Sequence, residues 1–273
     1  LLDAEHLGRL RTLILPNIAA MSDAQCEQIR EFVARGGSVV ATMETSLYDE
    51  SGARRENLGL ADLFGADVAG PLEGPTKNSY LRVDAETRHP LLRGLEMAGR
   101  IINGVYWLPV APREVSQGAP LTLIPAYPDL PMEEVYPRQA QTDIPAVYAR
   151  QVGAGRVVYF PWDIDRVFWE VLSVDHGVLL RNAVTWATHE PPVVTVAGPG
   201  VLDVTVWQQA ESMTVHLVNL TNPMMMKGPF RELLPVGRQT VSVRMPEGRT
   251  PKSARLLAVA SRVAYDERDG YVT

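Results

Sequence analysis

The segment 160–169 (FPWDIDRVFW) concentrates the side chains of this sequence that could do chemistry: two Trp, two Asp and one Arg after a predicted strand. Aromatic rings stack on sugar rings, and carboxylates hold sugar hydroxyls, so Trp162, Asp163 and Asp165 are candidate carbohydrate-binding residues. The alternative is structural: the tryptophans fill the core, and one of the two Asp residues caps the following helix. The structural role is favoured for Trp169 and stays open for Trp162.

The two Asp residues of this segment do not indicate a glycosidase centre. Such a centre needs two carboxyl groups placed across the bond that is cleaved. Asp163 and Asp165 are two positions apart in a predicted loop, and this spacing gives no evidence of that arrangement.

A second candidate site is the polar loop after the predicted strand 38–43. The loop begins at Glu44 and contains Thr45, Ser46, Tyr48, Asp49 and Glu50. In open α/β sheets, ligands bind outside the carboxyl ends of the strands. Glu44 could therefore accept hydrogen bonds from a sugar hydroxyl or pair with a cation of a partner subunit. The alternative is a solvated polar loop.

A third candidate lies in the segment 219–231, which runs from polar to apolar within the last third of the chain. It contains Lys227, a further candidate for substrate binding, and the run Met224–Met226. Exposed Met side chains adapt to varied surfaces. The segment is therefore predicted either to dock on another domain or subunit or to cover an open end of its own domain.

No catalytic residue, metal site or cofactor is predicted. A nucleophile elbow needs a sharp strand-to-helix turn with small flanking residues, whereas Cys26, the only cysteine, falls on the apolar face of a predicted helix and reads as a buried structural thiol. Ser46 lacks the flanking glycines. The histidines show no paired metal-ligand spacing: His6, His89, His176, His189 and His216. No GxGxxG or P-loop spacing occurs, so no nucleotide cofactor is expected.

The net charge of −6 argues against a nucleic-acid surface, and the local basic pair Arg54-Arg55 is followed by Glu56. No apolar run reaches the roughly 18 residues of a membrane helix, so no membrane partner is expected. With a single cysteine, a cytoplasmic location is favoured over secretion. The chain starts at Leu1 rather than Met and closes on a strand-like segment, so truncation at both ends is expected.

The elements that would position these residues begin with a βαβ unit. A strand over 10–15 precedes a helix that starts after Ser22, where Gln25 gives the spacing of a capping box, and Gly36-Gly37 ends that helix. The strand 38–43 follows, which predicts a parallel pairing. Later elements are a helix at 60–64, an insertion over 71–145 with strands 80–83 and 121–124, a hairpin of 146–151 with 156–160, and helices 168–172 and 178–187.

After Pro191-Pro192 the pattern changes to alternating strands, at 193–196, 202–207, 213–219 and 240–245. Short strands at this spacing indicate a sandwich or barrel. We therefore expect two domains: an α/β domain over 1–190 and an all-β domain over 193–273.

The segments 13–23 (LILPNIAAMSD) and 32–42 (FVARGGSVVAT) resemble the trimerisation domain of family 42 β-galactosidases and related glycoside hydrolases. The resemblance covers about residues 1–190, and the region from 193 looks like the small C-terminal domain of these enzymes. It implies a class I glutamine amidotransferase-like (flavodoxin-like) three-layer fold that lacks the amidotransferase nucleophile, here with its first strand and helix missing.

In that family the catalytic carboxylates lie on an N-terminal TIM barrel, which no part of this sequence matches. The resemblance thus implies a non-catalytic region that self-associates, as a trimer, and shapes the active site of a β-galactosidase-like enzyme whose barrel lies upstream in the same polypeptide. The alternative is a stand-alone carbohydrate-binding protein that uses the Trp162/Asp163 and Glu44 loops. A third hypothesis is a degenerate amidotransferase-like hydrolase with Cys26 or Ser46 as nucleophile.

Overall fold

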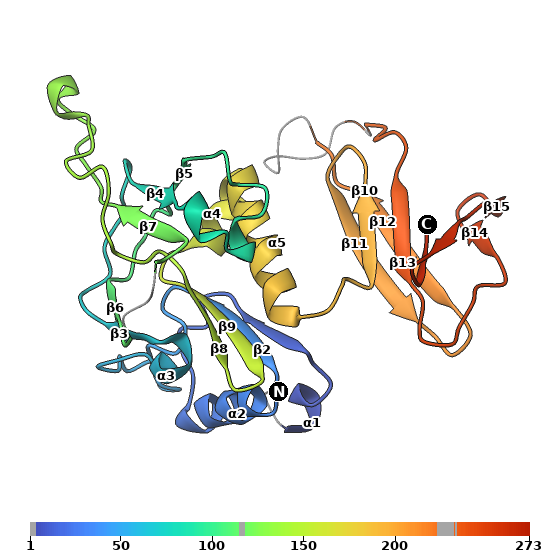
Figure 1. Cartoon of the computed structure of the whole chain (residues 1–273), viewed down its shortest axis with the longest axis horizontal. Helices are drawn as coiled ribbons and strands as arrows, with labels where there is room; N and C mark the ends of the chain where they lie inside the picture. Colours follow the sequence, from blue (N-terminus) through green and yellow to red (C-terminus); the bar gives the residue numbers. More distant parts are fainter. Residues whose placement is uncertain (1–3, 115–117, 223–231, 233) are drawn as a thin grey trace. The chain divides into compact units, whose positions relative to one another are not determined.

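The computed structural model describes residues 4–114, 118–222, 232 and 234–273. The chain divides into two compact units, Leu1–His189 and Glu190–Thr273 (Figure 1). Among the described residues, no helix combines the length and the apolar character needed to cross a membrane.

The first unit is built on a four-stranded sheet with the order β1-β2-β9-β8. Strands β1 (Thr12–Leu15), β2 (Ser38–Thr42) and β9 (Gly155–Phe160) are parallel, and β8 (Tyr148–Val152) joins β9 as an antiparallel edge. All five residues of β2 are buried, as expected for a strand covered on both faces. The predicted parallel βαβ pairing is confirmed.

Helix α2 (Asp23–Ala34) connects β1 to β2 and follows the sequence signals closely. The Ser22 side chain accepts a hydrogen bond from the Gln25 backbone, and the Gln25 side chain accepts one from the Ser22 backbone, so both halves of the capping box are present. The helix stops before Gly36, whose φ of 97° lies in a region that glycine adopts without strain.

The sheet separates two hydrophobic cores because side chains alternate between its faces. On one face, Val39 and Ala41 pack with α1 (Ala4–Leu7), α2 and α3 (Ala61–Phe64). On the other face, Val40 packs with α4 (Ile164–Val171) and α5 (Val174–Thr188). Figure 1 shows α2 and α5 on opposite sides of the sheet. The first unit is therefore a mixed α/β structure with helices on both faces.

The predicted insertion over 71–145 contains a second, three-stranded sheet with the order β5-β4-β7. Strands β4 (Tyr80–Val83) and β7 (Leu121–Ile124) have the predicted bounds, whereas β5 (Arg100–Ile102) was not predicted. The short pair of β3 (Ala66–Val68) with β6 (Val110–Pro112) was also missed. Helices α4 and α5 exist as predicted, but each begins four residues earlier than expected.

The second unit is all-β, and its four predicted strands are present. Strand β10 (Val194–Ala197) pairs with β13 (Thr240–Arg244), and that sheet continues through β17 (Tyr271–Val272) to β16 (Glu267–Arg268). Strands β11 (Leu202–Gln208) and β12 (Met213–Asn219) form a seven-residue antiparallel hairpin, and β14 (Ala254–Leu256) pairs with β15 (Ser261–Val263). Lys227 and Met224–Met226 lie outside the described residues.

Candidate functional site

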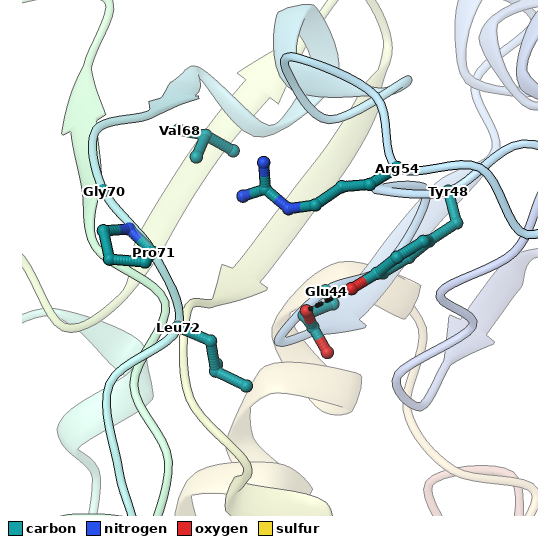
Figure 2. Close-up of a pocket in the computed structure, with 7 residues that line it drawn as sticks. All are labelled: Glu44, Tyr48, Arg54, Val68, Gly70, Pro71 and Leu72. Carbon is teal, nitrogen blue, oxygen red and sulfur yellow. Dashed lines mark hydrogen bonds between the residues drawn. The ribbon is translucent and has the colours of Figure 1, made fainter.

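An open hollow of about 450 Å³ lies beyond the carboxyl end of β2. Three polar side chains, from Glu44, Tyr48 and Arg54, line one side of it, and the other lining residues come from a single stretch: Val68, Gly70, Pro71 and Leu72. Figure 2 shows the carboxylate, the phenol and the guanidinium directed into the same space, with the Pro71 and Leu72 side chains across from them. The hollow is thus polar on one side and largely apolar on the other.

The backbone that presents Glu44 is held in an unusual conformation. Three non-glycine residues in the loops after β1 and β2 have positive φ: Asn17 at 46°, Met43 at 51° and Ser46 at 66°. Such conformations cost roughly 1–3 kcal/mol each and persist only where surrounding contacts impose them. Here the Glu44 N–H donates to Asn17 Oδ1 at 3.1 Å, and the Tyr159 hydroxyl donates to the Met43 carbonyl at 2.6 Å. Strain of this kind concentrates at functional sites.

The phenol of Tyr48 is a hydrogen-bond donor in this site. Its hydroxyl donates to Glu44 Oε1 at 3.2 Å. Burial and the negative charge of Glu44 raise the pKa of Tyr48, although the Arg54 guanidinium opposes this shift. Tyr48 therefore remains protonated at neutral pH. The three polar groups together offer a carboxylate acceptor, a phenol and a guanidinium donor, which suits a ligand rich in hydroxyl groups.

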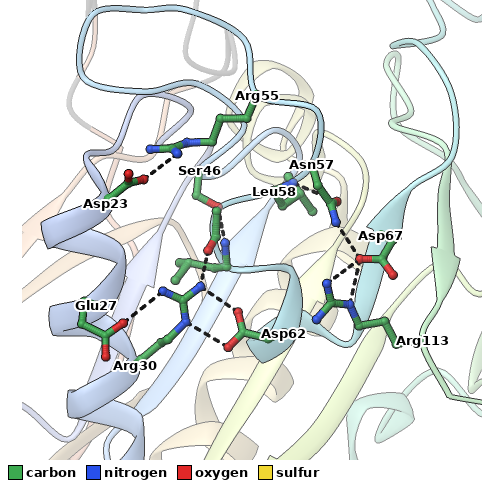
Figure 3. A network of polar contacts seen from close by, with 12 residues as sticks. Asp23, Glu27, Arg30, Ser46, Arg55, Asn57, Leu58, Asp62, Asp67 and Arg113 are labelled. Carbon is green, nitrogen blue, oxygen red and sulfur yellow. Dashed lines mark hydrogen bonds and ion pairs between the residues drawn. The ribbon is translucent and has the colours of Figure 1, made fainter.

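A network of ion pairs fixes the chain segment that carries Arg54 and leads to Val68 (Figure 3). Arg55 pairs with Asp23 at 2.5 Å, and Arg30 pairs with Asp62 at 2.9 Å, so both arginines tie this segment to α2. At its far end, the Arg113 side chain and the Asn57 amide donate hydrogen bonds to Asp67, and together they lower the pKa of that carboxyl.

Trp162 does not belong to this hollow. Its side chain is fully buried, its Nε1–H donates to the Ala146 carbonyl at 2.9 Å, and its ring packs edge-on against His176 at 5.2 Å between centroids. No face of the ring is open to a sugar. Of the two alternatives left open for Trp162, the structure gives it the core-filling role, and its candidacy as a sugar-binding residue is corrected.

Asp163 is also removed from solvent, with 1% of its surface exposed. It occupies the N-cap position of α4 but makes no capping hydrogen bond. Its Oδ1 accepts from the Tyr106 backbone N–H at 3.0 Å, and its Oδ2 accepts from Arg166 Nε at 3.0 Å. Asp163 therefore holds the loop that contains Tyr106 against the start of α4. Both of its carboxylate oxygens already accept hydrogen bonds from the protein, so it does not bind a sugar.

The two remaining residues discussed in this segment, Asp165 and Trp169, also differ from expectation. Asp165 is partly buried, and its Oδ1 has no hydrogen-bond partner within the part of the chain that the structure describes. It does not line the hollow. Trp169, for which a core role was favoured, is 71% exposed, so that prediction was wrong.

Neither predicted nucleophile candidate has the setting of a nucleophile. Cys26 is a buried residue of α2, and burial raises the pKa of its thiol despite the nearby Arg55. Ser46 is fully buried, and its Oγ accepts a hydrogen bond from the Leu60 N–H at 3.0 Å. Within the described residues, no group of three His, Cys, Asp or Glu side chains is arranged to hold a metal ion.

Of the site residues predicted from the sequence, the structure keeps Glu44 at an open site and adds Arg54, Tyr48 and the wall formed by residues 68–72. Sequence reasoning noted Arg54 only as part of a basic pair. The turn that brings Arg54 back beside Tyr48 has a local sequence signal in Asp49, whose carboxylate accepts hydrogen bonds from the Ser51 and Ala53 N–H groups. Tyr48 and Arg54 form an antiparallel bridge around this turn.

Comparison with solved structures identifies relatives in fold. The α-L-fucosidase isoenzyme 2 from Paenibacillus thiaminolyticus matches 99% of this chain with a TM-score of 0.71 at 18% identity. A catalytic mutant of Gan42B, a GH42 β-galactosidase from G. stearothermophilus, matches 93% with a TM-score of 0.59 at 15% identity. The cold-adapted β-galactosidase from Rahnella sp. R3 matches 81% with a TM-score of 0.58 at 17% identity. No protein-family model and no curated protein matches the chain.

These likenesses show a fold shared with portions of glycoside hydrolases. This chain spans 39% of the length of the fucosidase and 29% of each of the two β-galactosidases. The expected resemblance to a non-barrel part of GH42 β-galactosidases is confirmed at the level of fold, and the similar regions are parts of larger chains.

Proposed function

We propose that this chain is a non-catalytic region of a β-galactosidase-like glycoside hydrolase that mediates self-association and shapes the active site. The observation that carries the proposal is the match of most of this chain to a minor part of each of two β-galactosidases. In this proposal the first unit is a class I glutamine amidotransferase-like, flavodoxin-like domain. The parallel order β1-β2-β9, with α2 and α5 on opposite faces, supports that assignment.

The partner in this proposal is a catalytic TIM-barrel domain that supplies the two carboxyl groups. The contribution of this chain is then its loop edge, where Glu44 and Arg54 stand at the carboxyl end of β2. Loops at this edge of an α/β sheet are the ones that reach ligands. A purified chain that hydrolysed aryl-galactosides unaided would contradict the non-catalytic role.

Self-association is supported by the first strand of the sheet, and the trimer is what the resemblance to family 42 β-galactosidases implies. Strand β1 stands at one end of the strand order, so within the described residues its outer edge has no partner in the sheet. Large apolar side chains lie exposed on and around it: Leu10, Ile14 and Ile18, with Ile14 at 53%. An unpaired edge with apolar side chains favours pairing with another chain.

Sedimentation velocity over a wide concentration range tests this role. We expect the chain to sediment as a trimer and the Ile14→Lys variant to shift towards monomer, because a buried Lys charge opposes the contact. Met97→Lys is the matched control, because Met97 is almost fully exposed and lies in the insertion, away from β1. A monomeric wild type would refute self-association by the isolated chain, and assembly of Ile14→Lys like wild type would remove β1 from the interface.

The second candidate function is carbohydrate binding at the Glu44 hollow. It is favoured by one observation, the pairing of a polar wall with an apolar wall in an open depression. A sugar has the same division between hydroxyl edges and C–H faces. Because Trp162 and Asp163 are buried, this function now depends on the Glu44 loop alone. Calorimetric titration with galactosides tests it, and Glu44→Gln is expected to weaken any binding.

A further inference from the structure

We infer that the Glu44 hollow takes a sugar unit that carries a carboxylate, a hexuronate, with Arg54 as the group that binds the carboxylate. The inference rests on the second function proposed above and narrows its ligand class. It does not depend on the assembly role.

The first observation concerns the arginines around the hollow. Three of them are engaged in ion pairs: Arg55 with Asp23, Arg30 with Asp62 and Arg113 with Asp67. Arg54 is exposed, and it differs from all three because it forms no ion pair with a carboxylate in the described part of the chain. Its guanidinium lies close to the Tyr48 hydroxyl, which is neutral. The cation that faces the hollow is therefore available to an anionic ligand (Figure 2).

The second observation is the position of Glu44. Its carboxylate faces the same hollow as Arg54, yet the two do not form an ion pair. Each is oriented by another contact: Glu44 by its backbone bond to Asn17 and its side-chain bond from Tyr48, and Arg54 by its strand bridge to Tyr48. The hollow thus presents a donor fork and a separate acceptor, which a ligand with an anionic group and hydroxyl groups can satisfy together.

The third observation is the charge balance, which sets the kind of anion. A guanidinium binds a carboxylate through two parallel hydrogen bonds. Glu44 repels a doubly charged phosphate in the same hollow more strongly than a singly charged carboxylate, so the carboxylate fits better. Val68, Pro71 and Leu72 offer an apolar wall to the C–H face of a ring. A small carboxylate such as acetate would engage Arg54 and leave Glu44 and this wall without a partner.

The test is titration of the full chain, labelled with ¹⁵N, with D-galacturonate and with D-galactose, followed by NMR chemical-shift changes. We expect galacturonate to bind at least about ten-fold more tightly than galactose, since a hydrogen bond to a charged group contributes roughly 1.5 kcal/mol or more, which is about a factor of ten. Shifts should centre on residues 44–54 and 68–72. Arg54→Met should abolish the preference, and Arg93→Met, an exposed arginine of the insertion, should retain it.

The outcomes separate this inference from the function it rests on. Equal affinity for the two sugars, or a preference that survives Arg54→Met, overturns the carboxylate assignment while leaving sugar binding in place. Absence of binding by both sugars overturns both proposals. Tight binding of acetate or of inorganic phosphate in place of galacturonate identifies a plain anion site and also overturns the inference. The sedimentation experiment on self-association does not bear on any of these results.

Discussion

Replacing Asp163 by Asn tests whether this buried carboxylate is a structural clamp or a lost ligand site. The substitution keeps the shape of the side chain and one acceptor oxygen. That oxygen can still accept from the Tyr106 N–H, now at 3.0 Å from Oδ1. The other oxygen becomes an amide NH₂ that faces the Arg166 guanidinium, where the Nε and Nη2 groups both donate to Oδ2 in the wild type. The amide NH₂ and the guanidinium are both hydrogen-bond donors, so they cannot form a hydrogen bond with each other.

The expected cost follows from these contacts. Hydrogen bonds to charged groups contribute about 1.5–3 kcal/mol each. The Arg166 side chain is 41% exposed, so water partly replaces the lost partner, and the two bonds together are worth less than their sum. We expect Asp163→Asn to lower the free energy of unfolding by about 2 kcal/mol. Asp163→Ala should cost about 1–3 kcal/mol more, because the partly buried Tyr106 N–H then also loses its acceptor.

Urea unfolding followed by tryptophan fluorescence measures this loss, because four of the five tryptophans lie in the first unit. With an m-value of about 2 kcal/mol/M, the midpoint should fall by about 1 M. Glu170→Gln is the matched control: Glu170 pairs with the same Arg166, at 2.9 Å, but on the surface, so it should cost at most about 0.5 kcal/mol. If Asp163→Asn is no more destabilising than this control, the clamp is refuted.

Three further predictions follow from buried groups of the first unit. Burial lowers the pKa of His176 and of His89, so below about pH 6.5 the unfolded chain binds more protons than the folded chain does. Stability should therefore fall as the pH drops below that value, and His176→Gln should flatten the decline in urea titrations. A Cβ at Gly155 would lie 2.1 Å from the Gly37 carbonyl oxygen, so Gly155→Ala should cost about 2 kcal/mol or more; an unchanged melting temperature would contradict that contact. Because burial raises the pKa of the Cys26 thiol, iodoacetamide should label it only in denaturant, and rapid labelling of the native chain would show that it is accessible.

The elements that were predicted correctly are marked by sequence signals that lie close together along the chain. The capping box at Ser22, the apolar face of α2 and the stop at Gly36 lie within one short stretch, and all three are present. The missed strands lack such signals. Strand β3 has three residues, and its partner β6 begins 42 positions after β3 ends, so neither hydrophobic alternation nor a turn motif marks the pair. Their pairing is decided by tertiary contact.

The site was predictable only in part, for a similar reason. Glu44 was located by a rule of topology, since a residue after a parallel strand must stand at the ligand-binding edge. Arg54 reaches the same hollow through a turn closed by Asp49 and through ion pairs between distant side chains, such as Arg55 with Asp23. The wall at Pro71 and Leu72 comes from a stretch with no regular structure. No periodicity in the sequence connects these segments.

The positions of Trp162 and Trp169 follow the periodicity of the elements that carry them rather than their residue type. Val158, Phe160 and Trp162 alternate, and all three belong to the core on the α5 side of the sheet, so the two-residue period of β9 extends past its last residue. Helix α4 buries Ile164 and Val167. Trp169 follows Val167 by two positions, about 200° around a helix, and so falls on the opposite face. Once α4 is known to begin at Ile164 rather than at Phe168, the core role favoured for Trp169 reverses, while the period of β9 decides the open alternative for Trp162 in favour of the core.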